Sequence, residues 1–166
     1  MAAKLQQRDQ EMFQRCIGAQ ISKDFARATM YANECAEIRK MAKVVLSSQL
    51  ALERVLVRLE TIQEFGEVAA LMKPVSEVVH SIKGQISGIM PEVSFELSQI
   101  GEVLDEIVME AGEAGGSEQS MAPSPEAEVI LKEAAAIAEQ RMKERFPELP
   151  GARPSIGEGR ERYDLK

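Results

Sequence analysis

The longest uninterrupted pattern of apolar positions runs from Asp24 to Gly66. No proline or glycine lies between Phe25 and Phe65, and apolar or small residues recur at alternating spacings of four and three, which is typical of a helix packed along a partner. The pattern predicts one helix of about 43 residues, roughly 64 Å long. Its apolar stripe, called the heptad seam below, has one polar interruption at Gln49 and comprises Tyr31, Cys35, Ile38, Ala42, Val45, Leu52, Leu56 and Leu59.

A shorter amphipathic helix is predicted in front of the long one, over residues 2–18. Gly18 is suited to ending this first helix, and Ser22 or Asp24 to capping the second. Because the connection is short, the two helices are expected to form an antiparallel hairpin.

The two predicted helices differ in length, so the first covers only about 17 residues of the second. From about Val44 onward the seam needs another partner, which later helices, a neighbouring subunit or residues before Met1 would supply. The chain opens directly in a helical pattern, and we therefore expect both a missing N-terminal part and a neighbouring subunit.

After the long helix the apolar pattern continues in shorter pieces. Residues 67–73 form one such piece, and Pro74 permits a new helix to start after it. Gly84 weakens the helix that follows Pro74, and Pro91 begins another helix. Four residues are predicted as hinges at which the chain can bend or straighten: Gly66, Pro74, Gly88 and Pro91.

The pattern divides the chain into five parts and predicts an all-α fold, a long antiparallel helical hairpin followed by shorter jointed helices. Residues 1–110 form the helical core, and residues 111–125, rich in Gly, Ser, Pro and Glu, form a flexible linker. Residues 126–145 form a C-terminal helix, residues 146–150 a peptide motif, and residues 151–166 a disordered tail.

The motif is the pentapeptide Phe146-Pro147-Glu148-Leu149-Pro150. Its prolines favour an extended conformation with a low ordering cost, and Phe146 and Leu149 would project as apolar anchors. One interpretation is a simple helix stop, since proline often follows a helix end. The other is a recognition peptide that binds in a groove between helices.

Composition and charge refine this picture. Aromatic residues make up 4% of the chain and tryptophan is absent, which argues against a large globular core. The net charge of −7 conceals an asymmetry, because residues 1–60 carry ten basic and seven acidic residues whereas residues 61–166 carry ten and twenty. The asymmetry indicates either two solvated helix faces or a basic front half that meets an anionic surface.

Residues for catalysis are scarce. His80, the only histidine, is interpreted as a structural side chain, and Cys16 and Cys35 as small buried hydrophobes in a reducing compartment. No metal-ligand spacing, phosphate-binding glycine loop or nucleic-acid motif is present, so we expect no enzyme activity, cofactor, metal or nucleic-acid partner. No apolar run of membrane-spanning length and no secretory signal occur, which predicts a cytoplasmic protein with peripheral membrane contact.

Much of residues 4–150 resembles the ESCRT-III (Snf-type) family, most of all its archaeal cell-division branch, the Cdv system. Ala26–Lys43 (ARATMYANECAEIRKMAK) and Leu50–Gly66 (LALERVLVRLETIQEFG) resemble the second helix of such a subunit. Lys4–Cys16 resembles the end of the first helix, and Leu71–Val108 resembles the third and fourth. The pentapeptide at residues 146–150 resembles the MIT-interacting motif that recruits an AAA ATPase.

The chain departs from this family in two respects. Only about the last half of the family's first helix is present, without its membrane-facing beginning. The segment after Pro150 is too short for the winged-helix module found in some archaeal members.

The resemblance implies a polymer-forming subunit that remodels membranes in cell division or vesicle budding. Its expected partners are other copies, related ESCRT-III subunits, an anionic membrane surface and a MIT-domain AAA ATPase that disassembles the polymer. Two alternatives remain, a coiled-coil scaffold or adaptor without membrane activity and a carboxylate-rich helical-bundle enzyme.

Overall fold

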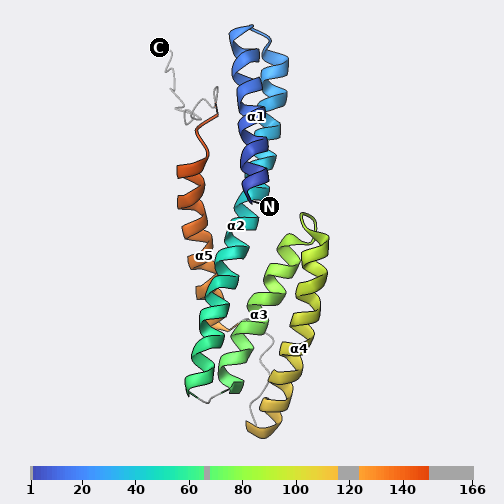
Figure 1. Ribbon diagram of the computed structural model, residues 1–166, viewed down its shortest axis with the longest axis vertical. Helices are drawn as coiled ribbons and strands as arrows, with labels where there is room; N and C mark the ends of the chain where they lie inside the picture. The colour runs from blue at the N-terminus through green and yellow to red at the C-terminus, as the bar shows by residue number, and fades with distance from the viewer. Residues whose placement is uncertain (1, 66–67, 116–123, 150–166) are drawn as a thin grey trace, which may run out of the picture.

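The computed structural model describes residues 2–65, 68–115 and 124–149, and the regular elements in these ranges are α-helices, which confirms the predicted all-α fold. The helices are α1 (Ala2–Ile21), α2 (Phe25–Phe65), α3 (Val68–Ile86), α4 (Pro91–Gly115) and α5 (Pro125–Arg145). The molecule is elongated (Figure 1). The first half of α2 pairs with α1, the second half lies between α3 and α5, and α4 packs on α3.

The α1–α2 turn forms one end of the molecule. α1 passes through Gly18 and continues to Ile21, so the prediction that Gly18 ends this helix is wrong. The reversal occurs at Lys23, whose φ of 58° is left-handed and normally favours glycine. Asp24 caps α2 as expected, since its Oδ1 accepts a hydrogen bond of 3.1 Å from the Arg27 amide.

Two of the four predicted hinge residues, Pro91 and Pro74, differ in their position within a helix. Pro91 begins α4, as expected, after a turn that contains Gly88. Pro74 does not begin a helix, because α3 already starts at Val68 and carries the proline inside it. A proline inside a helix costs a backbone hydrogen bond, but Pro74 is buried beside Val75 in the packed face of α3, and tertiary packing holds the helix together. The fourth candidate, Gly66, lies outside the described residues.

The connection before α5 is shorter than predicted. α4 continues to Gly115, so residues 111–115 are helical rather than part of the linker. α5 begins at Pro125, and Ser124 is its N-cap, accepting a hydrogen bond of 3.3 Å from the Ala127 amide. Ser124 also donates to Glu77 Oε2 through its amide (2.7 Å) and its hydroxyl (2.6 Å), which fixes the start of α5 on α3. The tail 151–166 lies outside the described residues.

The apolar core has two parts. A small cluster joins α1 to α2 around Cys16, Ala19 and Ala28. A larger cluster joins the second half of α2 to α3, α4 and α5, and it includes Leu46, Leu50, Ala51, Val55, Val75, Val78, Val79, Ile82, Leu97, Leu104, Ile130, Ala134 and Ala138.

The second half of α2 therefore has partners within the chain. Of the three kinds of partner that the sequence leaves open, the later helices cover this half, whereas we expected a neighbouring subunit and a missing N-terminal part. α3 and α5 bury Leu46, Leu50 and Val55. These residues are not those of the heptad seam, however. Among the seam residues Cys35, Ile38 and Ala42 are buried, Tyr31, Val45, Leu52 and Leu59 are half-buried, and Leu56 is 58% exposed.

Ile38→Asp tests the buried part of the seam. Ile38 is 0% exposed, so the substitution places an unpaired carboxylate in the core, and we expect a loss of about 4 kcal/mol of unfolding free energy. Urea unfolding followed by circular dichroism measures it. Met30→Asp, at an exposed position of the same helix, is the matched control and should change stability by less than about 0.5 kcal/mol. Equal unfolding midpoints for the two variants would contradict burial of Ile38.

Candidate functional site

The C-terminal peptide lies against the α1–α2 hairpin and is held by Arg39 of α2. Arg39 Nη1 donates a 2.7 Å hydrogen bond to the Pro147 carbonyl. The same guanidinium lies 5.6 Å from the centroid of the Phe146 ring, a cation–π distance. Phe146 and Leu149 are half-buried, whereas Pro147 and Glu148 are exposed. Pro150 lies outside the described residues.

Arg39 is itself fixed by Asp9 of α1. Its Nε donates to Asp9 Oδ1 at 2.7 Å and its Nη2 to Oδ2 at 3.0 Å, so the guanidinium engages both carboxylate oxygens. Asp9 is 1% exposed, and the Phe13 ring lies 5.8 Å from the guanidinium carbon. Asp9 of α1 thus positions the Arg39 side chain that holds the C-terminal peptide.

The sequence pattern does not single out Asp9 or Arg39. A signal for Asp9 was nevertheless present, because it falls between Leu5 and Cys16 on the apolar face of the first helix. A carboxylate on a buried face requires a cationic partner, and only the register of the hairpin identifies that partner as Arg39.

The body of α5 adheres to α2 mainly through small side chains. Its buried residues are Ala127, Ile130, Ala134 and Ala138. Two ion pairs flank them, Lys43 with Glu139 at 3.4 Å and Arg54 with Glu133. The charge of Lys43 lowers the pKa of Glu139, but both side chains are solvated, and such pairs add little. Leu131, Ile137 and Met142 add partly buried apolar contacts to the core, so apolar packing holds α5 more than these ion pairs do.

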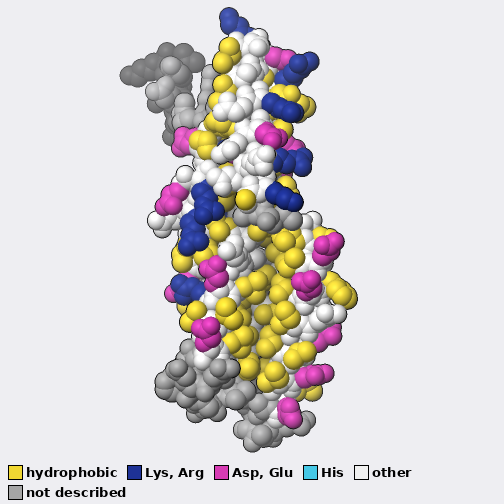
Figure 2. Space-filling model, viewed as in Figure 1, with side chains coloured by type: hydrophobic (Ala, Val, Ile, Leu, Met, Phe, Trp, Pro, Cys, Tyr) yellow, Lys and Arg dark blue, Asp and Glu magenta, His cyan; other side chains and the backbone are white. Residues whose placement is uncertain are grey.

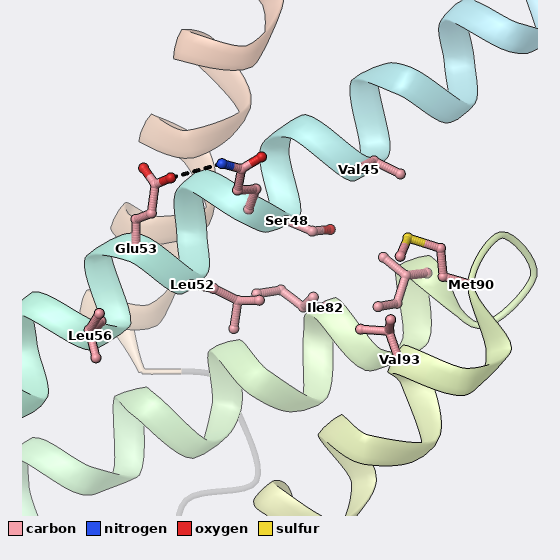
Figure 3. A pocket seen from close by; sticks show the side chains of 10 residues that line it. Val45, Ser48, Leu52, Glu53, Leu56, Ile82, Met90 and Val93 are labelled. Atoms are coloured by element: carbon pink, nitrogen blue, oxygen red, sulfur yellow. Dashed lines mark hydrogen bonds between the residues drawn. The ribbon is translucent and has the colours of Figure 1, made fainter. Parts of the chain in front are cut away.

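An open apolar groove of about 350 Å³ runs between α2, α3 and the start of α4 (Figure 3). Three seam residues that are not fully buried, Val45, Leu52 and Leu56, line its α2 side. The remaining lining residues are Ser48, Gln49, Glu53, Ile82, Ile86, Met90 and Val93. Figure 2 shows hydrophobic side chains gathered in this half of the molecule, with acidic side chains along the margins.

His80 has the structural role predicted for it. Its Nε2 lies 2.9 Å from Asp105 Oδ2 on α4, and Ser76 donates a second hydrogen bond to that carboxylate. Burial raises the pKa of Asp105, but the bonds from Ser76 and His80 outweigh it and leave the pKa below its ordinary value. Gly101 leaves room for the imidazole, since a Cβ there would lie 2.8 Å from His80 Cε1.

Both cysteines are buried, as predicted. Cys16 Sγ donates to the Ala28 carbonyl at 3.4 Å. Burial, followed by the charge of Asp9, raises the pKa of Cys35 to about 11, so this thiol stays protonated at neutral pH. A protonated, buried thiol is a poor nucleophile and metal ligand.

Within residues 2–65, 68–115 and 124–149, no three His, Cys, Asp or Glu side chains are grouped so as to hold a metal ion. In the same described ranges, no helix combines the length and apolarity needed to cross a membrane.

Three proteins of Sulfolobus acidocaldarius are similar to this chain. Cell division protein B1 is 53% identical over 150 residues, which cover 90% of this chain and 70% of that protein. The chain belongs to the archaeal Cdv family of ESCRT-III-type subunits.

Cell division protein B is 38% identical over 150 residues, and the match covers 89% of this Cdv chain but only 57% of the relative. Cell division protein B3 is 29% identical over 122 residues, and the match covers 70% of this chain and 68% of the relative. No family model and no solved structure matches the chain.

Arg39→Met tests the charge pair beneath the C-terminal peptide of this Cdv subunit. The substitution leaves the Asp9 carboxylate buried without its partner, and we expect a loss of about 3 kcal/mol of stability in urea unfolding. Lys40→Met is the matched control, because Lys40 is exposed and its ion pair with Glu37 lies on the surface. The double variant Asp9→Leu/Arg39→Met should recover most of the loss. A double variant no more stable than Arg39→Met would contradict this account.

Proposed function

We propose that this chain is a polymer-forming subunit that remodels membrane in cell division, and that a MIT-domain AAA ATPase disassembles the polymer through residues 146–150. The similar proteins B1 and B are named cell division proteins. The chain spans less than two thirds of B, so the activity of the whole protein is part of this proposal.

The observation that carries the proposal is the part of the heptad seam that lines the groove and is not fully buried. Val45, Leu52 and Leu56 form an apolar row along α2 that no helix in the described ranges fully covers. Although Gln49 interrupts this row, apolar side chains gathered along an open groove mark an interaction site rather than a scatter of surface side chains. A contact with another copy or a related subunit would bury it.

The C-terminal peptide suits recruitment of an ATPase. It follows a helix with few large buried side chains and is held by one hydrogen bond and one ring contact from Arg39. A partner with a groove for Phe146 and Leu149 would compete with these contacts without disturbing the Asp9–Arg39 pair. The turn at Gly88 and Pro91 gives the α3–α4 pair a joint for rearrangement during assembly.

Peripheral contact with an anionic membrane agrees with the charge distribution. Most of the Lys and Arg side chains visible in Figure 2 lie over the α1–α2 half, whereas Asp and Glu dominate the other half. Basic groups near a surface attract anionic lipids, and the attraction weakens within a Debye length.

The direct test of function is assembly on liposomes. The full 166-residue chain, incubated with vesicles containing acidic lipid, should sediment with them and form filaments visible by negative-stain electron microscopy. Vesicles of neutral lipid are the control and should bind at least tenfold less protein. Filaments without vesicle binding would favour a scaffold, and monomers in both samples would overturn the proposal.

Leu149→Asp tests the recruitment peptide. A charge in an apolar MIT groove should weaken binding more than tenfold in a calorimetric titration with a MIT domain. Glu148→Gln, at the adjacent exposed position, is the control for a general change in the peptide. Unchanged affinity of Leu149→Asp would show that residues 146–150 are not the contact, while the assembly test above would stand by itself.

A further inference from the structure

The turn between α1 and α2 carries exposed apolar and basic side chains. Ile21 is 78% exposed, Phe25 65% and Met30 56%, although each is a large hydrophobic side chain. Lys23 and Arg27 are exposed among them. Ile21, Lys23, Phe25, Arg27 and Met30 are called the tip below. Asp24 in the same turn pairs with Arg27 at 3.3 Å, so Lys23, Asp24 and Arg27 together leave a net charge of +1. Exposed apolar groups clustered at one end of a molecule indicate a contact surface.

The groove has the complementary character. It is concave and apolar, and Glu53 stands at its edge (Figure 3). The neighbouring helix α4 carries six carboxylates and no lysine or arginine from Pro91 to Glu110. Ser48, which also lines the groove, has a buried hydroxyl with no hydrogen-bond partner among the described residues. Lys83, which follows the lining residue Ile82 on α3, is a basic group beside the groove, and it donates to Ser98 of α4. The groove therefore favours an apolar occupant, and its margin along α4 favours basic flanks.

One molecule cannot bring its own tip to its own groove. Phe25 and Leu52 lie on the same uninterrupted helix, and 27 residues of helix span about 40 Å. Any contact between the two surfaces must join separate molecules. Because the surfaces differ, each copy would donate its tip to one neighbour and its groove to another, an arrangement that extends into an open filament.

We propose that the tip of one molecule inserts into the groove of a second copy, so that copies join head to tail with an axial repeat of about 40 Å. This inference rests on the polymer-forming role proposed above and specifies its contact. An anionic lipid surface would also attract the tip, but it would leave the groove open and would be repelled by α4. A second copy satisfies both surfaces at once, with opposite charges at the margins.

The test combines two variants that each retain one surface. Phe25→Ser removes the tip anchor and Leu56→Asp disables the groove, and both positions are exposed, so both variants should fold. Circular dichroism checks this point. Each variant alone should need at least a tenfold higher concentration than the parent to assemble. An equimolar mixture should form dimers in analytical ultracentrifugation and stop there, because only one intact tip meets one intact groove.

Val129→Ser, at an exposed apolar position outside tip and groove, is the matched control and should assemble like the parent. Mixtures that remain monomeric, or single variants that assemble like the parent, would overturn the tip-in-groove contact. In the second case the parent still polymerises, and the proposed function survives. Loss of liposome binding by Phe25→Ser with unchanged assembly in solution would assign the tip to the membrane and likewise overturn the contact.

Discussion

The structure depends on one constraint, the need to cover an uninterrupted helix of 41 residues. α1 covers the first half of α2, while α3 and α5 cover the second. The buried face changes between the halves, from Cys35 and Ile38 to Leu50 and Val55. A strict heptad stripe drifts by about 20° per repeat around a straight helix, so a seam aligned with α1 at Cys35 has turned by roughly 60° at Leu56. The incomplete burial of the seam along the groove is the expected consequence of this drift.

Local signals in the sequence were sufficient for most helix boundaries. The caps at Asp24 and the starts at Pro91 and Pro125 follow from the chemistry of single residues. The errors arose where tertiary packing outweighed a local preference. Pro74 stays inside α3 because its neighbours are buried. α1 passes through Gly18, which was expected to end it, and the chain reverses at the left-handed Lys23.

The sequence does not show which residues far apart in the chain contact one another. Asp9 and Arg39 meet only in the correct hairpin register, and Arg39 and Pro147 are separated by 108 positions. The alanine-rich face of α5 also predicts only a narrow contact, with no indication of which helix receives it. The prolines of the pentapeptide predict an extended segment after the helix, as Phe146 shows, whereas its docking on the hairpin required the three-dimensional structure.

The contacts that hold the C-terminal peptide differ in free energy from the Asp9–Arg39 pair inside the hairpin. The peptide gains about 1.5–3 kcal/mol from a hydrogen bond to a charged group and about 0.5–1 kcal/mol from an exposed cation–π contact. A partner that binds with micromolar affinity supplies about 8 kcal/mol, which is enough to displace it. Breaking the Asp9–Arg39 pair is different, because it would leave a carboxylate uncompensated in the hairpin core. Arg39 can therefore release Phe146 and Pro147 while it continues to hold α1 against α2, so exposure of the peptide does not require the hairpin to unfold.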